Sequence, residues 1–198
     1  MHEEGEVMVI KKVLGVVGSS RRNGNTHILV SKILEGAKDA GGKAELLLLK
    51  DMNIKDCDGC HACWKGKPCS KKDDMNGIYP KIIESDIIVF GTPVYWYGPT
   101  ALMKAFLDRF VFFNCPENRE TIKGKTAVLA IPFEEENPEA ADLLVGMFEK
   151  SLDYLEMNLA GKILAPGVTL RGEIANKTVI LKEGYDLGMS LARKDDIR

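Results

Sequence analysis

A stretch near the start of the chain indicates the fold: Val13-Leu-Gly-Val-Val-Gly-Ser-Ser-Arg-Arg-Asn-Gly-Asn-Thr26. Its first part, Val13–Val17, is a short apolar run with β-branched ends, which is typical of a buried parallel strand. Met8–Ile10 can extend that strand toward the N-terminus. A helical pattern follows over residues 27–40, with apolar side chains on one face and Gly41-Gly42 after its last residue. A strand, a polar loop and a helix in this order form the first unit of a parallel α/β sheet.

The polar loop between that strand and helix is a candidate phosphate site. Free backbone N–H groups and the positive end of the helix meet in a loop of this kind. The loop has neither the Gly-Lys-[Ser/Thr] ending of a nucleoside-triphosphate loop nor the Gly-x-Gly-x-x-Gly pattern of a dinucleotide loop. Its side chains suit one terminal phosphate, and the candidate ligands are Ser19, Ser20, Asn25 and Thr26, with Arg21 or Arg22 adding positive charge. The alternative is an ordinary capped turn.

The rest of the chain repeats this alternation. Further strands are expected over residues 44–49, 86–91, 126–131 and 162–170, the last broken by Pro166-Gly167. Helices are expected over residues 73–85, 100–110, 138–159 and 174–193. The five strands and five helices predict an α/β fold, a flavodoxin-like doubly wound parallel sheet in the order 2-1-3-4-5. One domain is expected over residues 1–198, with a cysteine-rich loop at about residues 50–75, after the second strand.

A loop rich in aromatic residues follows the third strand, Thr92-Pro-Val-Tyr-Trp-Tyr-Gly-Pro-Thr100. The carboxyl ends of parallel strands are where α/β sheets bind ligands, and exposed aromatic side chains need a partner. A planar ring system would find walls and backbone donors in this loop, and the candidate residues are Pro93, Val94, Tyr95, Trp96 and Gly98. The alternative is that the aromatic residues cover the sheet or meet a neighbouring subunit. Because this loop and the phosphate loop flank the same switch point, they indicate one ligand, flavin mononucleotide (FMN).

Four of the five cysteines lie within thirteen residues, at Cys57, Cys60, Cys63 and Cys69. A [4Fe–4S] cluster takes four thiolates, and a Cys-x-x-Cys-x-x-Cys run lets one loop reach three of the irons, with Cys69 reaching the fourth. Zinc also takes four thiolates, but usually from two separate Cys-x-x-Cys pairs, and here the pairs share Cys60. The remaining alternatives are a disulfide and an empty thiol loop.

Several other polar or aromatic residues are expected to have no part in the chemistry. His61 is interpreted as a bystander or as a donor to a ligand, and Trp64 as a cover for the site or part of an interface. Asp108 and Arg109 are interpreted as structural or interfacial, and Cys115 as an inert buried thiol. No catalytic acid or base is predicted.

The composition argues against several classes of protein. A formal net charge of −2 gives no basic surface for nucleic acid. No apolar run approaches the length of a membrane span, and Met1–Glu6 is acidic and lacks the apolar segment of a signal peptide. Thiols at this density predict a reducing compartment, so the expected location is the cytoplasm.

Taken together, these stretches resemble the iron–sulfur flavoproteins of anaerobic prokaryotes, which belong to the wider NADPH-dependent FMN reductase branch of flavodoxin-like proteins. The resemblance covers nearly all of residues 13–131, and it rests on Gly18-Ser-Ser-Arg-x-Asn-Gly-Asn-Thr26, the four cysteines, Asp73-Asp-Met75 and Gly91-Thr-Pro-Val-Tyr-Trp96 followed by Lys104-x-x-x-Asp108-Arg109. It implies FMN, with Asn23 among the binding residues, and a [4Fe–4S] cluster near a subunit interface. It also implies a homo-oligomer, either dimer or tetramer. One departure is Pro132-Phe-Glu-Glu-Glu136, where such proteins commonly have glycines, and this acidic loop disfavours an anionic nicotinamide cofactor.

The resemblance implies an electron-transfer oxidoreductase in which a ferredoxin-like one-electron donor, the cluster and FMN exchange electrons. An alternative is a reductase of FMN or quinones that depends on NAD(P)H and whose cysteine loop holds no cluster. A further alternative is a non-enzymatic binding module in which zinc stiffens the cysteine loop for a partner protein.

Overall fold

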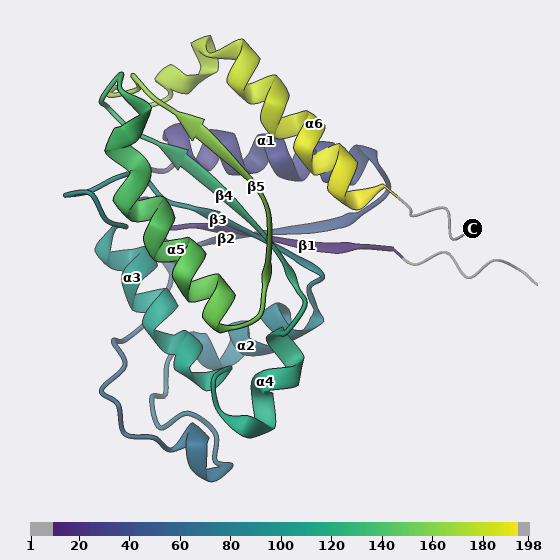
Figure 1. Ribbon diagram of the computed structural model, residues 1–198, viewed down its shortest axis with the longest axis vertical. Coiled ribbons are helices and arrows are strands. Elements are labelled where there is room, and N and C mark those ends of the chain that lie inside the picture. Colours follow the sequence, from purple (N-terminus) through teal and green to yellow (C-terminus); the bar gives the residue numbers. More distant parts are fainter. Residues whose placement is uncertain (1–9, 194–198) are drawn as a thin grey trace, which may run out of the picture.

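The computed structural model describes residues 10–193 and has a parallel β-sheet at its centre (Figure 1). The sheet order is β2-β1-β3-β4-β5, and the strands are β1 (Lys12–Val17), β2 (Lys43–Leu48), β3 (Ile87–Gly91), β4 (Thr126–Pro132) and β5 (Asn158–Ala165). Each neighbouring pair is parallel. This arrangement confirms the flavodoxin-like order 2-1-3-4-5. Met8 and Val9, expected to extend the first strand, lie outside the described residues.

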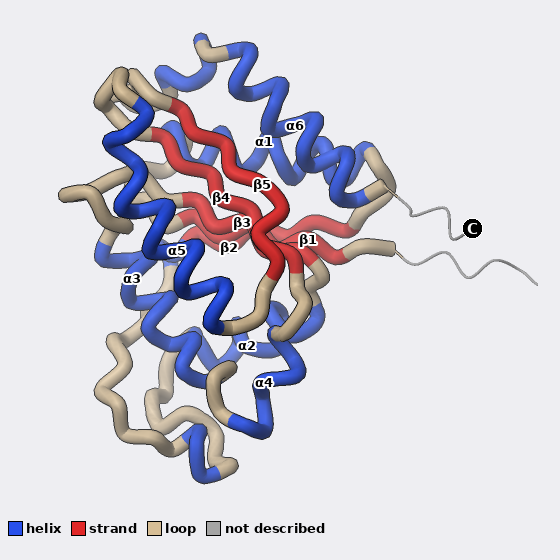
Figure 2. The backbone as a smooth tube through the Cα atoms, in the orientation of Figure 1, coloured by secondary structure: helices blue, strands red, loops and turns tan. Residues whose placement is uncertain are grey.

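Helices cover both faces of the sheet (Figures 1 and 2). One face carries α1 (Asn25–Asp39) and α6 (Thr178–Ala192). The other side carries α2 (Met75–Glu84), α3 (Ala101–Asp108), α4 (Pro116–Ile122) and α5 (Asp142–Tyr154). Two separate apolar clusters result, one on each face. Within residues 10–193, no helix is long and apolar enough to cross a membrane.

The sequence of β3 explains why a helix layer is needed on each face. Successive side chains of a strand point to opposite faces of the sheet. Ile88 and Phe90 belong to the cluster under α3 and α5, whereas Ile87 and Val89 belong to the cluster under α1. A strand with apolar residues on both faces is stable only when both faces are covered.

The expected end of the helix over residues 138–159 and the expected bounds of the strand after it are wrong. The helix expected over residues 138–159 is a short 3-10 turn followed by α5, which ends at Tyr154. Glu156 then adopts a left-handed conformation with φ of 57°, which turns the chain back toward the sheet. As a result β5 begins at Asn158 instead of residue 162, and it ends at Ala165 instead of residue 170.

Two further helical segments differ from expectation. The helix α4 is not among the expected elements, although proline is common at the first position of a helix, where Pro116 stands. The last helix begins at Thr178 and not at Ile174, because residues 173–176 form a separate 3-10 turn.

Three loops leave the carboxyl ends of the neighbouring strands β1, β3 and β4. The first two begin side by side, since the Gly18 N–H donates to the Gly91 carbonyl oxygen over 2.7 Å. The Thr92 N–H donates to the carbonyl oxygen of Ala130 in β4 over 3.2 Å. Position 91 has to be glycine, because a Cβ there would lie 2.3 Å from Cγ2 of Val30 in α1. The close packing brings the N-terminus of α1 to this edge of the sheet.

Candidate functional site

A cavity with about 530 Å³ of empty space opens at this edge of the sheet, and we call it the sheet-edge cavity. Its walls come from the ends of four strands, and the lining residues are Ser19, Arg21, Asn25, Thr26, Pro93, Val94, Tyr95, Pro132, Phe133, Glu134, Val168 and Thr169. The phosphate loop and the aromatic loop, predicted to share a ligand, therefore face one cavity.

The phosphate loop ends at the N-terminus of α1, where Gly24 is the N-cap. No side chain caps this helix, so the N–H groups of its first turn remain free to bind an anion. Position 24 is restricted to glycine, since a Cβ there would lie 2.8 Å from the Arg21 Cβ. Thr26, in the same turn, is buried and lines the cavity. This part of the cavity is suited to a phosphate group.

Two predicted phosphate ligands are also bonded to a distant segment of the chain. The Asn25 amide donates to the Leu170 carbonyl oxygen over 3.0 Å, and its Oδ1 accepts from the Ile174 N–H over 3.1 Å. The Arg21 guanidinium donates to the Thr169 carbonyl oxygen over 2.9 Å. Asn25 and Arg21 therefore hold the segment after β5 against the phosphate loop and shape the cavity wall.

The aromatic loop is a tight turn. The Tyr95 N–H donates to the Gly98 carbonyl oxygen over 2.8 Å, and the Gly98 N–H returns a bond of 3.0 Å. Trp96 and Tyr97, between them, have left-handed φ values of 50° and 60°. The Trp96 residue is 97% exposed and does not line the cavity, whereas Tyr95 does. Of the three aromatic residues in this loop, Tyr95 lines the cavity, whereas Trp96 is directed into solvent.

The remaining predicted cofactor residues do not line the cavity: Ser20, Asn23 and Gly98. The wall also contains residues that are not among the predicted cofactor residues. Pro132, Phe133 and Glu134 show that the acidic third loop does reach the cavity. Val168 and Thr169 carry no motif, and only their place after β5, at the same sheet edge, could have indicated them.

The cysteine loop projects away from the sheet, beside α2 and α4 (Figures 1 and 2). It lines a second cavity, which we call the cysteine cavity, where about 400 Å³ of space includes part of the open solvent at its mouth. All four predicted ligands line it, namely Cys57, Cys60, Cys63 and Cys69. None of the five cysteines, all of which lie in the described part of the chain, forms a disulfide. The loop therefore presents four free thiols to one space.

The thiols do not converge on a point. Within residues 10–193, no three His, Cys, Asp or Glu side chains lie close enough together to hold one metal ion. A zinc site brings every sulfur to about 2.3 Å from a single ion, whereas a cluster takes one thiolate on each iron and keeps the sulfurs farther apart. Cys63 is buried, and its burial, with the nearby Cys115, raises the pKa of its thiol. Cys60 is exposed, and its sulfur lies 3.0 Å from the Ser70 hydroxyl.

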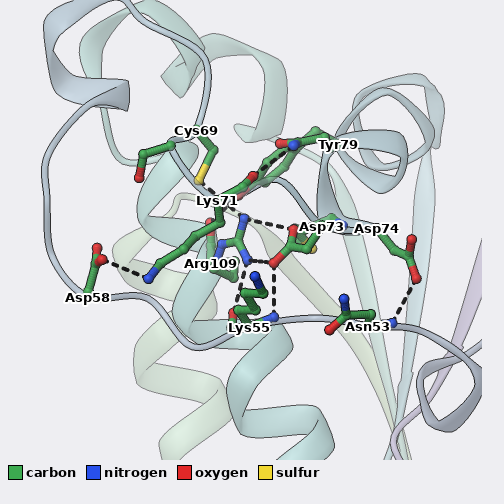
Figure 3. Close-up of polar contacts among 12 residues, drawn as sticks. Asn53, Lys55, Asp58, Cys69, Lys71, Asp73, Asp74, Tyr79 and Arg109 are labelled. Atoms are coloured by element: carbon green, nitrogen blue, oxygen red, sulfur yellow. Dashed lines mark hydrogen bonds and ion pairs between the residues drawn. The ribbon is translucent and has the colours of Figure 1, made fainter.

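Arg109, which lines the cysteine cavity, forms a buried ion pair with Asp73 (Figure 3). Arg109 and Asp73 have side-chain exposures of 1% and 0%, and their guanidinium and carboxylate meet through two hydrogen bonds of 2.6 and 3.2 Å. Arg109 also donates to the Lys55 carbonyl oxygen over 2.9 Å and to the Cys69 sulfur over 3.2 Å. From the sequence, Arg109 is expected to be structural or interfacial, and no sequence signal connects it with a cysteine.

Both side chains of the ion pair, Arg109 and Asp73, are charged in the folded protein. Burial alone would raise the pKa of Asp73, but hydrogen bonds from Arg109 and from the N–H groups of Lys55 and Met75 hold it below its ordinary value. Burial alone would lower the pKa of Arg109, but the bonds to Asp73 and the neighbouring Tyr79 and Cys69 raise it. The lining of the cysteine cavity therefore holds a permanent positive charge with one carboxylate partner.

The residues present fit both groups that the sequence suggests. The sheet-edge cavity combines an uncapped helix N-terminus with hydroxyl groups and an aromatic wall, which suits a phosphate joined to a planar ring. The cysteine cavity has four free thiols and a guanidinium donor to one of them, which suits a cluster with thiolate ligands.

Several known proteins are similar to this chain. An iron–sulfur flavoprotein of Archaeoglobus fulgidus is 44% identical over 98 residues, which is 50% of this chain and 48% of that protein. The putative NAD(P)H-dependent FMN-containing oxidoreductase YwqN of Bacillus subtilis is 28% identical over 79% of this chain and 85% of its own length. A solved NAD(P)H:quinone oxidoreductase from Methanothermobacter marburgensis has the same fold, with a TM-score of 0.71 at 16% identity, covering 92% of this chain and 98% of that one.

The extent of these matches differs. The chain spans about half the length of the iron–sulfur flavoproteins that it matches, 48% to 51% in three of them. A sequence profile described as NADPH-dependent FMN reductase matches residues 11–142, which include the phosphate loop, the cysteine loop and the aromatic loop. The chain therefore belongs to the NADPH-dependent FMN reductase family.

Proposed function

We propose that this chain is a flavin-dependent oxidoreductase that binds FMN in the sheet-edge cavity and a [4Fe–4S] cluster in the cysteine cavity. In this proposal it takes single electrons from a ferredoxin-like donor in the cytoplasm. The observation that carries the proposal is the pair of cavities in one chain. One has four free thiols, and the other has an uncapped helix N-terminus beside an aromatic wall.

The sheet-edge cavity would hold FMN by its two ends. The N–H groups at the start of α1, with Ser19 and Thr26, would bind the phosphate. Tyr95 would pack against the ring, and the backbone of the aromatic loop would reach the ring acceptors. Glu134 places a carboxylate in the same wall, so a second anionic group there would be repelled.

The cysteine cavity would hold the cluster through Cys57, Cys60, Cys63 and Cys69. When bound, FMN supplies two-electron chemistry and an iron–sulfur cluster supplies one-electron chemistry, so the pair connects donors and acceptors of different kinds. The names of the similar iron–sulfur flavoproteins support this assignment.

The proposal is tested by Cys60→Ser, because a serine hydroxyl stays protonated where a thiolate is required. The variant should lose iron, keep near-normal FMN and lose flavin reduction by reduced ferredoxin, while dithionite still bleaches its flavin. Stopped-flow absorbance with each reductant measures this. Cys115→Ser is the matched control, since Cys115 is buried and does not line the cavity. Reduction of the iron-free variant by ferredoxin at the wild-type rate would overturn the proposed route.

A second candidate is an NAD(P)H-dependent FMN or quinone reductase that needs no cluster. It is favoured by the match to YwqN, which covers more of this chain than the iron–sulfur flavoproteins do. Under this alternative, Cys60→Ser oxidises NADPH with a quinone acceptor as fast as the wild type does. Steady-state absorbance at the nicotinamide band distinguishes the two candidates.

A further inference from the structure

We propose that Arg109 is a positioning residue for Cys69, and that its buried positive charge raises the reduction potential of a cluster held by that cysteine. The inference rests on the proposed function, because it requires a cluster in the cysteine cavity. It concerns a residue outside the ligand set, since Arg109 would bind the sulfur of a ligand and not the metal.

The Arg109 side chain joins the body of the protein to both arms of the cysteine loop (Figure 3). Arg109 follows α3 directly, in a 3-10 turn over Arg109–Phe112. Its guanidinium contacts Lys55, which precedes the first of the four cysteines in the chain. It also contacts Cys69, the last of the four, and Asp73, which follows them. All of these contacts lie between 2.6 and 3.2 Å. A planar group with fixed donors is well suited to hold three partners at once.

The backbone of Arg109 is held in place from another side. The Tyr79 hydroxyl in α2 donates to the Arg109 carbonyl oxygen over 3.3 Å. The Tyr79 ring stacks on Phe112 with a centroid distance of 4.1 Å and an interplanar angle of 20°. Arg109 therefore starts from a rigid position, and Cys69 is tied to it. By contrast, Cys60 is exposed, and its hydrogen bonds are to the Ser70 hydroxyl and, through its backbone N–H, to the Asp58 carboxylate, both in the same loop.

The charge of Arg109 has a direct consequence for an electron added beside it. Reduction adds one negative charge to the cluster and its thiolates, and a buried cation in contact with one sulfur stabilises that charge. A hydrogen bond to a ligand sulfur acts in the same direction. The Asp73 carboxylate opposes both, because it lies next to the guanidinium and carries the opposite charge. The two residues should therefore shift the potential in opposite directions.

The test is a reductive titration of the anaerobic, cluster-loaded full chain, followed by electron paramagnetic resonance. Dithionite supplies one electron to the oxidised cluster, and no bond is made or broken in the protein. Arg109→Gln should lower the reduction equilibrium constant about tenfold, which is about 59 mV more negative for a one-electron couple. Asp73→Asn keeps the cation and removes the anion, so its potential should become more positive than that of the wild type.

Lys71→Gln is the matched control. Lys71 also lines the cysteine cavity, but its side chain is 24% exposed and paired with the exposed Asp58. Solvent screens such a charge, so the control should shift the potential less than Arg109→Gln does. If Arg109→Gln fails to fold or to load iron, an absent or negative shift in Asp73→Asn still overturns the proposal.

The outcomes separate the two levels of the proposal. A wild-type chain that holds no cluster after anaerobic reconstitution overturns the proposed function. A loaded wild type in which Asp73→Asn leaves the potential unchanged or lowers it overturns the role of Arg109. Shifts of the same sign in Arg109→Gln and Asp73→Asn would also overturn it, because a loosened loop moves both variants in one direction, whereas the two charges move them in opposite directions. Equal shifts from Lys71→Gln and Arg109→Gln would also overturn it.

Discussion

The hydroxyl of Thr100 donates a hydrogen bond to the carbonyl oxygen of Gly18, and so joins the end of the aromatic loop to the start of the phosphate loop. Thr100 is also the N-cap of α3, where its hydroxyl oxygen accepts from the Met103 N–H over 3.2 Å. One buried side chain thus begins a helix and fixes the spacing of the two loops that line the sheet-edge cavity.

We expect Thr100→Val to lose both functions. The lost cap and the unpaired Gly18 carbonyl should lower the free energy of unfolding by about 1–3 kcal/mol. FMN should bind about tenfold more weakly, since the two loops are no longer joined. Urea unfolding and fluorescence titration with FMN measure the two effects. Thr121→Val, in α4 and away from this cavity, is the control and should leave FMN affinity unchanged.

Thr26→Val tests the phosphate end of the cavity. Thr26 is 2% exposed, lines the cavity and lies in the uncapped first turn of α1. A hydrogen bond to a charged group contributes about 1.5–3 kcal/mol, so the FMN dissociation constant should rise by a factor of about 10 to 150. Isothermal titration with FMN and with riboflavin, which has no phosphate, localises the loss. An equal loss for both ligands would mean that Thr26 does not bind the phosphate.

Acid should weaken the fold partly through Asp73. The folded-state pKa of Asp73 lies below its unfolded value of about 3.9, so its contribution to stability is fully present above that value. The contribution is lost as the pH falls through the lower folded-state pKa. Asp73→Asn should be less stable at pH 7, by about 3–5 kcal/mol, because the buried Arg109 loses its counter-charge.

Urea unfolding of the cluster-free protein between pH 7 and pH 2 gives the comparison. The difference in unfolding free energy between the wild type and Asp73→Asn should be constant down to about pH 5 and then shrink. A difference that stays constant to pH 2 would show that Asp73 is not ionised in the folded state.

The exposed aromatic side chains predict a homo-oligomer. Trp96 is almost fully exposed, and Trp64, Tyr95 and Tyr97 are each exposed by about half. Clusters of exposed aromatic residues usually mark a contact surface. Light scattering of the anaerobic protein at micromolar concentration should give the mass of a dimer or tetramer, and Trp96→Ser should reduce it. A monomer in the wild type would contradict this expectation.

The sheet could be predicted because its strands are short apolar runs between turn residues. Ile87–Gly91, for example, has apolar residues on both faces, which occurs in covered parallel sheets. The end of α5 could not be predicted in the same way. Leu152, Leu155 and Leu159 continue a helical spacing, yet Leu159 lies in β5. Only the pairing of β5 with β4, which is distant in sequence, decides that boundary.

The residues that line the two cavities could be predicted from the sequence to different extents. The four candidate cysteine ligands lie within thirteen residues of the chain, so their spacing is informative, and the structure brings all four to one cavity. The partner of Cys69 is different, because Arg109 is 40 residues away and its bond to the sulfur depends on the packing of α3. For Trp96 the prediction fails in another way. Its place in the aromatic loop predicts a cofactor contact, but a tight turn directs its side chain into solvent.

The most direct measurement counts the cofactors in protein purified without oxygen. We expect about one FMN, four iron atoms and four acid-labile sulfides per chain, with flavin released by acid that migrates as FMN. The absorption spectrum should combine a flavin with a broad iron–sulfur band. A protein that contains FAD or no flavin, or that holds zinc in place of iron after anaerobic reconstitution, would contradict the joint assignment of the two cavities.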